Sequence, residues 1–241
     1  MLVLALSSAT SFAQLRTIDV SPEPSPASAG AFYPNSWALV IGINRYPKAP
    51  GLAYAVADAN AVAEALPALG FPKENIRLLL DGNATKARIE RVLDREFPKM
   101  GPDDRLLVFF AGHGETLRIK GGEEGFLLPF DADPEALAST AISMDEVKKI
   151  GLRAKAKHVL FVMDACFSGF AATREAPRPA TDEYITAALR EPVIQVITAG
   201  RKGERAIEDA GHGLFTRRFL DGLRILLLRR HRDDGPTCRV A

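Results

Sequence analysis

The chain has 241 residues, of which 47% are hydrophobic and 25% are charged, an ordinary composition for a globular protein. This length suits one well-buried domain or two small ones. A formal net charge of +1 creates no basic field for nucleic acid, so no nucleic-acid partner is expected. The two cysteines, Cys166 and Cys238, exclude a disulfide framework, and stability must therefore come from a hydrophobic core.

The N-terminus begins with a short apolar run, MLVLALSSATSFAQ, that ends in small residues. This run predicts a signal peptide over residues 1–13 and export to the periplasm or the medium, although no Lys or Arg precedes it. The alternative is a cytoplasmic protein. The run is too short to span a bilayer, so no stable membrane insertion is expected. Residues 14–35, rich in Pro, Ser and Ala, are typical of a flexible linker.

Short apolar runs alternate with amphipathic segments over residues 36–228, the predicted folded domain. Runs rich in Val, Ile, Leu and Phe that are separated by helices indicate a mainly parallel sheet covered on both faces, a three-layer α/β fold. Such sheets bind ligands at the carboxyl ends of their strands. The strands are expected at residues 37–43, 75–80, 104–112, 156–165 and 193–200.

The ends of the helices carry recognisable signals. Gly70 is typical of a helix stop, and Asn83 is expected to cap the following helix. Ser143, with Glu146 three residues later, predicts a capping box. A hairpin is expected around the glycine pair 121–122. The helices are expected at residues 55–70, 84–97 and 212–228 and from Ser143 onward, with a tail at residues 229–241.

A histidine and a cysteine each follow a predicted strand directly. His113 lies in FFAGHG and Cys166 lies in DACFSG, so both fall at the ligand-binding edge of the sheet. Glycines such as Gly112 and Gly169 allow the sharp turns that such positions need. Together the two side chains predict a thiolate–imidazole pair. The alternative is a buried, inert cysteine and a histidine that merely occupies a turn.

These two motifs resemble those of caspase-like cysteine peptidases, specifically the metacaspase and bacterial caspase-like branch. The residue numbers of His113 and Cys166 differ by 53, close to the roughly 50 found in caspases. The likeness covers residues 37 to about 225 and includes ALVIGINRY, AVADANAVAEAL, GFLLPFDAD and GLFTRRFLDGL. It implies a caspase-like fold and a cysteine endopeptidase.

The resemblance also implies roles for individual residues. Cys166 is expected to be the nucleophile that forms a thioester acyl-enzyme, and His113 to protonate the leaving amine. The backbone N–H groups of Gly114 and Cys166 are expected to form the oxyanion hole. The resemblance requires no third, orienting acid.

An acid stands two residues before the cysteine. Caspases have Gln at this place and cleave after aspartate, whereas metacaspase-like enzymes have an Asp here and a second one on the first helix. The matching residues are Asp164 and Asp58. Two carboxylates in one pocket would pair with a guanidinium or ammonium group, which predicts cleavage after Arg, then Lys. The alternatives are a helix-surface acid for Asp58 and a turn cap for Asp164.

Calcium activates many metacaspases, and Asp131, Asp133 and Asp145 are conceivable oxygen ligands. Thr173 stands where another acidic ligand would be expected, so calcium is left unassigned and no cofactor is expected. The resemblance further implies protein or peptide substrates and a monomer.

The segment from Thr173 to Glu191 occupies the place of a processing linker in the family. Arg174, Arg178 and Arg190 would suit self-cleavage after arginine, but a plain surface loop is slightly favoured.

Two other function classes are alternatives for such a sequence. A pseudoprotease that acts as a binding or signalling module is expected to have lost Cys or His, and this chain has both. A nucleotide binder needs a glycine-rich phosphate loop after the first strand. VIGINRYPKAPG has the wrong spacing and a blocking proline, so this class is discarded.

Overall fold

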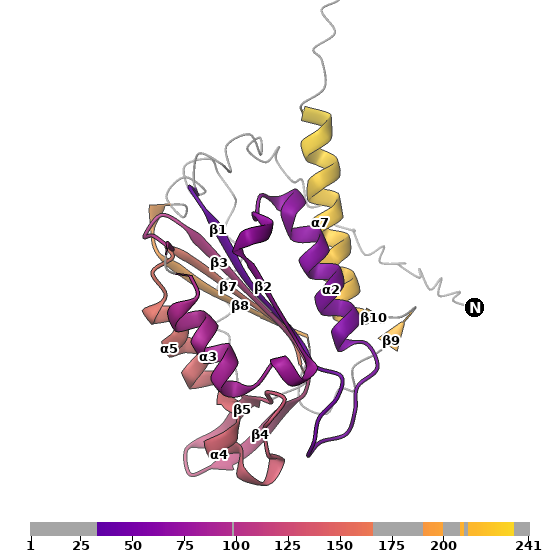
Figure 1. Cartoon of the computed structure of the whole chain (residues 1–241), viewed down its shortest axis with the longest axis vertical. Helices are drawn as coiled ribbons and strands as arrows, with labels where there is room; N and C mark the ends of the chain where they lie inside the picture. The colour runs from indigo at the N-terminus through magenta and orange to yellow at the C-terminus, as the bar shows by residue number, and fades with distance from the viewer. Residues whose placement is uncertain (1–32, 98, 166–189, 200–207, 210–211, 234–241) are drawn as a thin grey trace, which may run out of the picture.

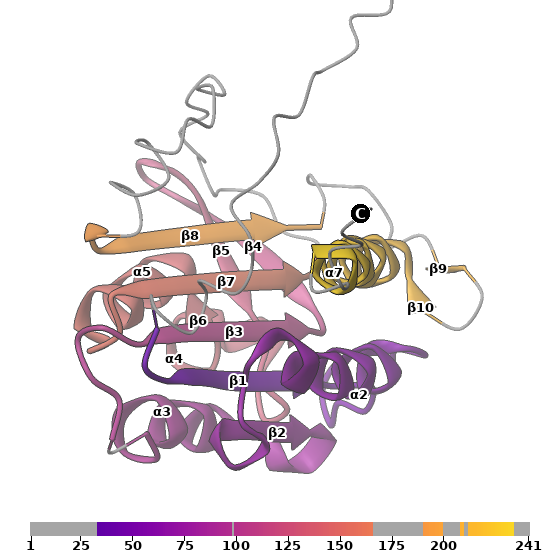
Figure 2. The same cartoon turned by 90° about the horizontal axis from the view of Figure 1, so that it is seen from above.

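The computed structural model describes residues 33–97, 99–165, 190–199, 208–209 and 212–233. At its centre lie five strands in one sheet, which Figure 2 shows from above. All four pairings in this sheet are parallel, which confirms the mainly parallel α/β fold. Across the sheet the order is β2 (Ile76–Leu80), β1 (Ser36–Gly42), β3 (Arg105–Ala111), β7 (His158–Asp164) and β8 (Val193–Thr198).

Helices cover both faces of the sheet, as the three-layer expectation requires (Figures 1 and 2). One face carries α2 (Ala55–Ala65) and α7 (Leu214–Asp233), and the other carries α3 (Lys86–Arg95) and α5 (Met144–Arg153). A 3₁₀ turn, Leu66–Leu69, extends α2 as far as Gly70. Gly70 has φ 85°, a left-handed conformation that glycine adopts without strain, so the predicted helix stop is confirmed.

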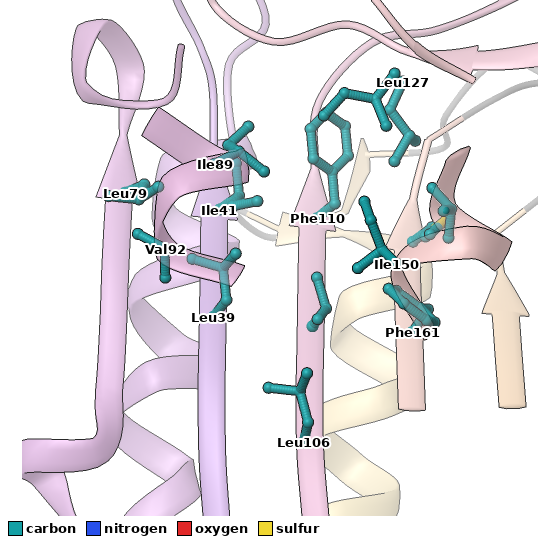
Figure 3. Packing of buried hydrophobic residues seen from close by; sticks show 14 of the residues in the cluster. Leu39, Ile41, Leu79, Ile89, Val92, Leu106, Phe110, Leu127, Ile150 and Phe161 are labelled. Atoms are coloured by element: carbon teal, nitrogen blue, oxygen red, sulfur yellow. The ribbon is translucent and has the colours of Figure 1, made fainter. Parts of the chain in front are cut away.

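Alternation along the strands divides the apolar side chains between the two faces. On β1, Leu39 and Ile41 pack toward α3 and α5, whereas Ala38 and Val40 pack toward α2. Every residue of β1 is buried, as expected for a strand covered on both sides. Figure 3 shows the first of these clusters, which also includes Leu79, Ile89, Val92, Leu106, Phe110, Leu127, Ile150 and Phe161.

A second, smaller sheet follows β3 in the chain. It consists of the antiparallel strands β4 (Gly114–Ile119), β5 (Gly122–Leu127) and β6 (Ile142–Ser143), with the short helix α4 (Leu137–Thr140) before β6. The hairpin predicted at the two glycines is confirmed. A two-stranded ribbon, β9 (Glu208–Asp209) with β10 (His212–Gly213), precedes α7.

Helix caps agree with the prediction at one helix and differ at another. The Ser143 hydroxyl accepts the N–H of Glu146 at 3.1 Å, which confirms the start of α5. The expected cap of α3, Asn83, is wrong. Asn83 ends a 3₁₀ turn, and the hydroxyl of Thr85 accepts the N–H of Arg88 instead. Threonine is itself a good cap, and the extra turn moves the start of the helix two residues along the chain.

The predicted signal peptide at residues 1–13, most of the linker and residues 234–241 lie outside the described residues. Export therefore stays a prediction. Helix α7 continues to Asp233, past residue 228. Within the part of the chain that the structure describes, no helix has the length and apolar character needed to cross a membrane.

Close packing of α2 on β1 requires glycine at position 42. A Cβ at Gly42 would lie 2.5 Å from the carbonyl oxygen of Ala55 and 2.6 Å from the Cβ of Ala59. We expect Gly42→Ala to lower the free energy of unfolding by about 1–3 kcal/mol through overpacking, measured by urea denaturation.

Gly121→Ala is the matched control, because a Cβ there would meet nothing within 4 Å. It should change stability by less than about 0.5 kcal/mol. Equal effects of the two substitutions would contradict the close approach of α2.

Candidate active site

The strands β3 and β7 end side by side at the carboxyl edge of the sheet. Their register pairs Ala111 with Asp164, and the N–H of Gly112 donates to the carbonyl of Asp164 at 3.2 Å, one residue beyond the strand. The chain order of the strands also reverses direction at β1, which lies between β2 and β3. Ligands of open parallel sheets bind at such a reversal, outside the strand ends.

His113 lies half-buried at this edge, immediately after β3. Its ring Nε2 is 2.8 Å from the carbonyl oxygen of Pro50, and its backbone N–H donates to the hydroxyl of Tyr46 at 3.0 Å. The Tyr46 ring is tilted against the imidazole, with 5.0 Å between centroids. A carbonyl oxygen can only accept, so Nε2 carries the proton in this bond. In the neutral ring Nδ1 is then unprotonated and can accept a proton.

The loop between β1 and α2 brings Tyr46 and Pro50 to the histidine, and two polar side chains hold it. The Asn44 side chain accepts from the N–H of Val56 at 3.0 Å and donates to the carbonyl of Ala53 at 3.1 Å. Asp81, after β2, accepts the N–H groups of Asn44 and Arg45 at 2.8 and 2.9 Å. Burial by itself would raise the pKa of Asp81, but these hydrogen bonds outweigh it and lower the pKa.

The backbone N–H of Gly114, the first residue of β4, takes no part in the hydrogen bonds between β4 and β5. The ladder bond at this point runs from the N–H of Leu128 to the carbonyl of His113, at 3.0 Å. Gly114 and Leu127 are therefore a non-hydrogen-bonded pair, and the N–H of Gly114 points away from β5.

Asp58 and Asp164 come together around Gly213, just before α7. A Cβ at Gly213 would lie 2.8 Å from Oδ2 of Asp164 and 3.2 Å from Oδ2 of Asp58, so these two oxygens are no further apart than the sum of those distances. Oδ2 of Asp58 accepts the N–H of Gly213 at 3.1 Å. Asp58 is 2% exposed, so it is not a helix-surface acid.

Asp164 accepts two hydrogen bonds from the first turn of α7. Its Oδ2 is 2.6 Å from the hydroxyl and 3.3 Å from the backbone nitrogen of Thr216, a side chain that is 0% exposed. Burial raises the pKa of Asp164, and the bonds from Thr216 oppose that shift. Asp164 thus does cap a helix, but the helix belongs to a distant part of the chain.

Cys166 and Gly169 lie outside the described residues, as do Arg174 and Arg178. Arg190 is exposed, three residues before β8. The dyad and the processing sites therefore stay predictions.

Two of the three conceivable calcium ligands, Asp131 and Asp133, have other partners. Asp131 accepts the N–H of Lys86 at 2.8 Å, and Asp133 pairs with Lys48 at 2.7 Å. Asp145 lies in the first turn of α5. Over the described ranges, no group of three or more His, Cys, Asp or Glu side chains is arranged to hold a metal ion. Calcium stays unassigned.

Residues 35–226 match the family described as the caspase domain, peptidase group C14. The chain belongs to the caspase-domain family. Since the match covers most of the chain, the predicted family is confirmed, and the domain is that of a cysteine-type peptidase.

Individual relatives agree with this family. A curated "probable protease" from a Desulfuromonadales bacterium is 29% identical over 78% of this chain, and the chain spans only 26% of that protein. A crystal structure of a Geobacter sulfurreducens protein has a TM-score of 0.57 at 20% identity, covering 85% of this chain and 90% of that one. The Drosophila initiator caspase Dronc has a TM-score of 0.50 at 10% identity, covering 80% and 65%. Both structures show the same fold.

Four residues of this caspase domain escaped the sequence interpretation: Tyr46, Pro50, Gly213 and Thr216. Pro50 contacts His113 through its backbone carbonyl, a contact that the type of residue does not predict. Gly213 and Thr216 follow His212 in the GHGLFT stretch, so the second GHG triplet was a usable signal of a special turn. Tyr46 ends the ALVIGINRY stretch that the family likeness includes, but that likeness gave it no role of its own.

The Thr216 hydroxyl stabilises the ionised form of Asp164. Removing this hydroxyl should therefore lower the free energy of unfolding by an amount that depends on pH. Because burial raises the pKa of Asp164, the folded protein loses stability as pH rises from the usual aspartate value through the raised one. Thr216→Val raises that pKa further. We expect a cost of about 1–2 kcal/mol near pH 7 and a smaller cost near pH 4, measured by urea denaturation.

The same substitution in an Asp164→Asn background is the control. There the cost should be smaller and independent of pH. A cost in the Asp164 background that does not change with pH would show that Asp164 is not the partner that matters.

Proposed function

We propose that this caspase domain is a cysteine endopeptidase in which Cys166 and His113 form the catalytic dyad, with a preference for Arg, then Lys, at P1. The register of β3 and β7 carries the proposal. Each pair, from Arg105 with His158 to Ala111 with Asp164, differs by 53 in residue number. Cys166 and His113 differ by the same number. This equal spacing supports Cys166, which follows β7, as the partner of His113, which follows β3.

Alternation along β7 supports the same arrangement. Ala165 still packs into the cluster on the α3–α5 face, whereas Asp164 contacts α7 on the other face. The next side chain, Cys166, is therefore expected on the face of Asp164. A relative named as a probable protease is consistent with peptidase activity, although this chain spans a quarter of it.

The proposed reaction uses the groups in a fixed order. The Cys166 thiolate attacks the scissile carbonyl carbon, and the carbonyl electron pair moves onto oxygen. His113 holds the thiol proton and delivers it to the leaving amine as the C–N bond breaks, which leaves a thioester. Water then attacks the thioester, with His113 as base, and releases the acid and the thiol. The Pro50 carbonyl, 2.8 Å from Nε2, orients the imidazole through both steps.

The oxyanion is assigned to the N–H groups of Gly114 and Cys166. The outward direction of the Gly114 N–H, away from the β4–β5 ladder, supports this assignment. A donor that is already aimed outward pays no reorganisation cost when charge develops on the carbonyl oxygen.

The P1 preference is assigned to Asp58 and Asp164. Both carboxylates lie around Gly213, at the edge of the sheet that also holds His113. Both bonds donated by Thr216 reach Oδ2 of Asp164, so Oδ1 stands outside this contact. A guanidinium has a planar fork of donors that matches carboxylate oxygens better than a single ammonium does, hence Arg before Lys.

Substitution of the dyad tests the activity. On a peptide ending in Arg, we expect Cys166→Ala to abolish turnover and His113→Gln to lower kcat by at least about 10²-fold. His158→Gln is the matched control, because that histidine lies at the start of β7, on the opposite edge. Wild-type turnover in the Cys166→Ala variant would refute the nucleophile assignment.

Substrate charge tests the pocket. Citrulline has the shape of arginine without its charge, so the ratio of kcat/KM for Arg over citrulline peptides isolates the carboxylates from the dyad. We expect this ratio to rise with pH through the raised pKa of Asp164, because only the ionised acid attracts the guanidinium. In Asp164→Asn the ratio should fall by about 10-fold or more and that pH dependence should flatten. A ratio near one in the wild type would refute the acidic pocket.

A further inference from the structure

Tyr46 belongs to a closed ring of hydrogen bonds around the backbone of His113. The N–H of His113 donates to the Tyr46 hydroxyl at 3.0 Å, and the hydroxyl donates to the carbonyl of Leu128 at 3.2 Å. The N–H of Leu128 closes the ring on the carbonyl of His113 at 3.0 Å. Three separate segments are joined in this way: the loop after β1, the turn after β3 and the end of β5.

The ring requires a neutral phenol, because one hydroxyl must accept one bond and donate another. Burial is the largest influence on the Tyr46 phenol and raises its pKa far above the usual value. The hydroxyl therefore keeps its proton at neutral pH.

Gly112 lets the hydroxyl reach the turn. A Cβ at Gly112 would lie only 2.6 Å from the Tyr46 hydroxyl oxygen and 3.0 Å from the Phe110 ring. The glycine thus makes room for the tyrosine as well as allowing the chain to turn. The close approach is a second observation, independent of the hydrogen bonds, that seats Tyr46 on this turn.

The hydrogen bonds of the turn also determine which backbone groups of residues 112–114 are used within the protein and which point outward. Gly112 donates to Asp164, and His113 uses both its N–H and its carbonyl within the ring. The N–H of Gly114 is directed away from β5 by the same ladder bond that Leu128 makes. Rotation of the peptide groups on either side of His113 would therefore move the imidazole and the proposed oxyanion donor together.

We propose that Tyr46 is a positioning residue that holds the His113 backbone, and through it both the imidazole and the N–H of Gly114, in the geometry needed for peptide-bond cleavage. This inference rests on the proposed function. Tyr46 touches neither the substrate nor the reacting atoms, so its removal should affect the rate of the chemical step more than substrate binding.

Tyr46→Phe is the test, because it keeps the ring and opens two of the three bonds. On an Arg peptide we expect kcat to fall by about tenfold or more while KM changes less than about twofold. The second measurement is amide hydrogen exchange by NMR. The His113 amide should exchange at least about tenfold faster in Tyr46→Phe, even without substrate.

Tyr33→Phe is the matched control. The Tyr33 hydroxyl is 2.5 Å from Nδ1 of His158, at the amino edge of the sheet, so its removal also costs one tyrosine hydrogen bond. It should leave kcat and the exchange of the His113 amide unchanged. Gly112→Ala is a second perturbation that should reproduce the Tyr46→Phe pattern, since the added methyl group displaces the hydroxyl.

The outcomes separate this inference from the proposed function. Unchanged kcat in an active Tyr46→Phe variant, or unchanged exchange of the His113 amide, overturns the positioning role. A lower thermal stability with kcat intact shows a purely structural tyrosine and overturns it as well. A wild-type chain without peptidase activity refutes the proposed function, and the exchange measurement then decides whether Tyr46 still holds His113.

Discussion

The parallel pairing of β3 with β7 is the constraint on which the candidate site depends. The pairing extends one residue past β3, through the hydrogen bond from the N–H of Gly112 to the carbonyl of Asp164. The two strands are therefore still aligned where the proposed functional motifs begin. Residues paired between β3 and β7 differ by 53 in number, as do His113 and Cys166. Under the proposed function, the register of these two strands therefore determines the spacing that the two motifs need.

Close approach at glycines organises the rest of that edge. Helix α2 packs on Gly42, the Tyr46 hydroxyl sits against Gly112, and both carboxylates surround Gly213. In each case a backbone without a side chain lets a polar or helical element reach the strand ends. A side chain at any of these three glycines, which come from three parts of the chain, would collide with the element packed against it.

The sequence predicted the parts of this arrangement that depend on local pattern. Buried strands such as β1, the Ser143 cap and the glycine hairpin follow from periodicity and turn chemistry, and the two acids followed from a family likeness. What escaped prediction depends on tertiary contact. The Thr216 hydroxyl meets Asp164 across 52 residues, and Tyr46 meets His113 across 67. No local sequence pattern predicts a contact between residues so far apart in the chain.

The position of Asp164 beside the proposed nucleophile poses an electrostatic problem, because a negative charge there raises the pKa of a thiol. Its Oδ2 accepts two bonds at the N-terminus of α7, where the helix dipole is positive, so part of that charge is balanced locally. Burial still raises the pKa of Asp164, which makes its ionised form costly in the free protein. A guanidinium in the pocket would remove that cost and neutralise the charge near the thiol. Under the proposed function, the substrate that the pocket selects is also the one that completes the electrostatics of the reaction.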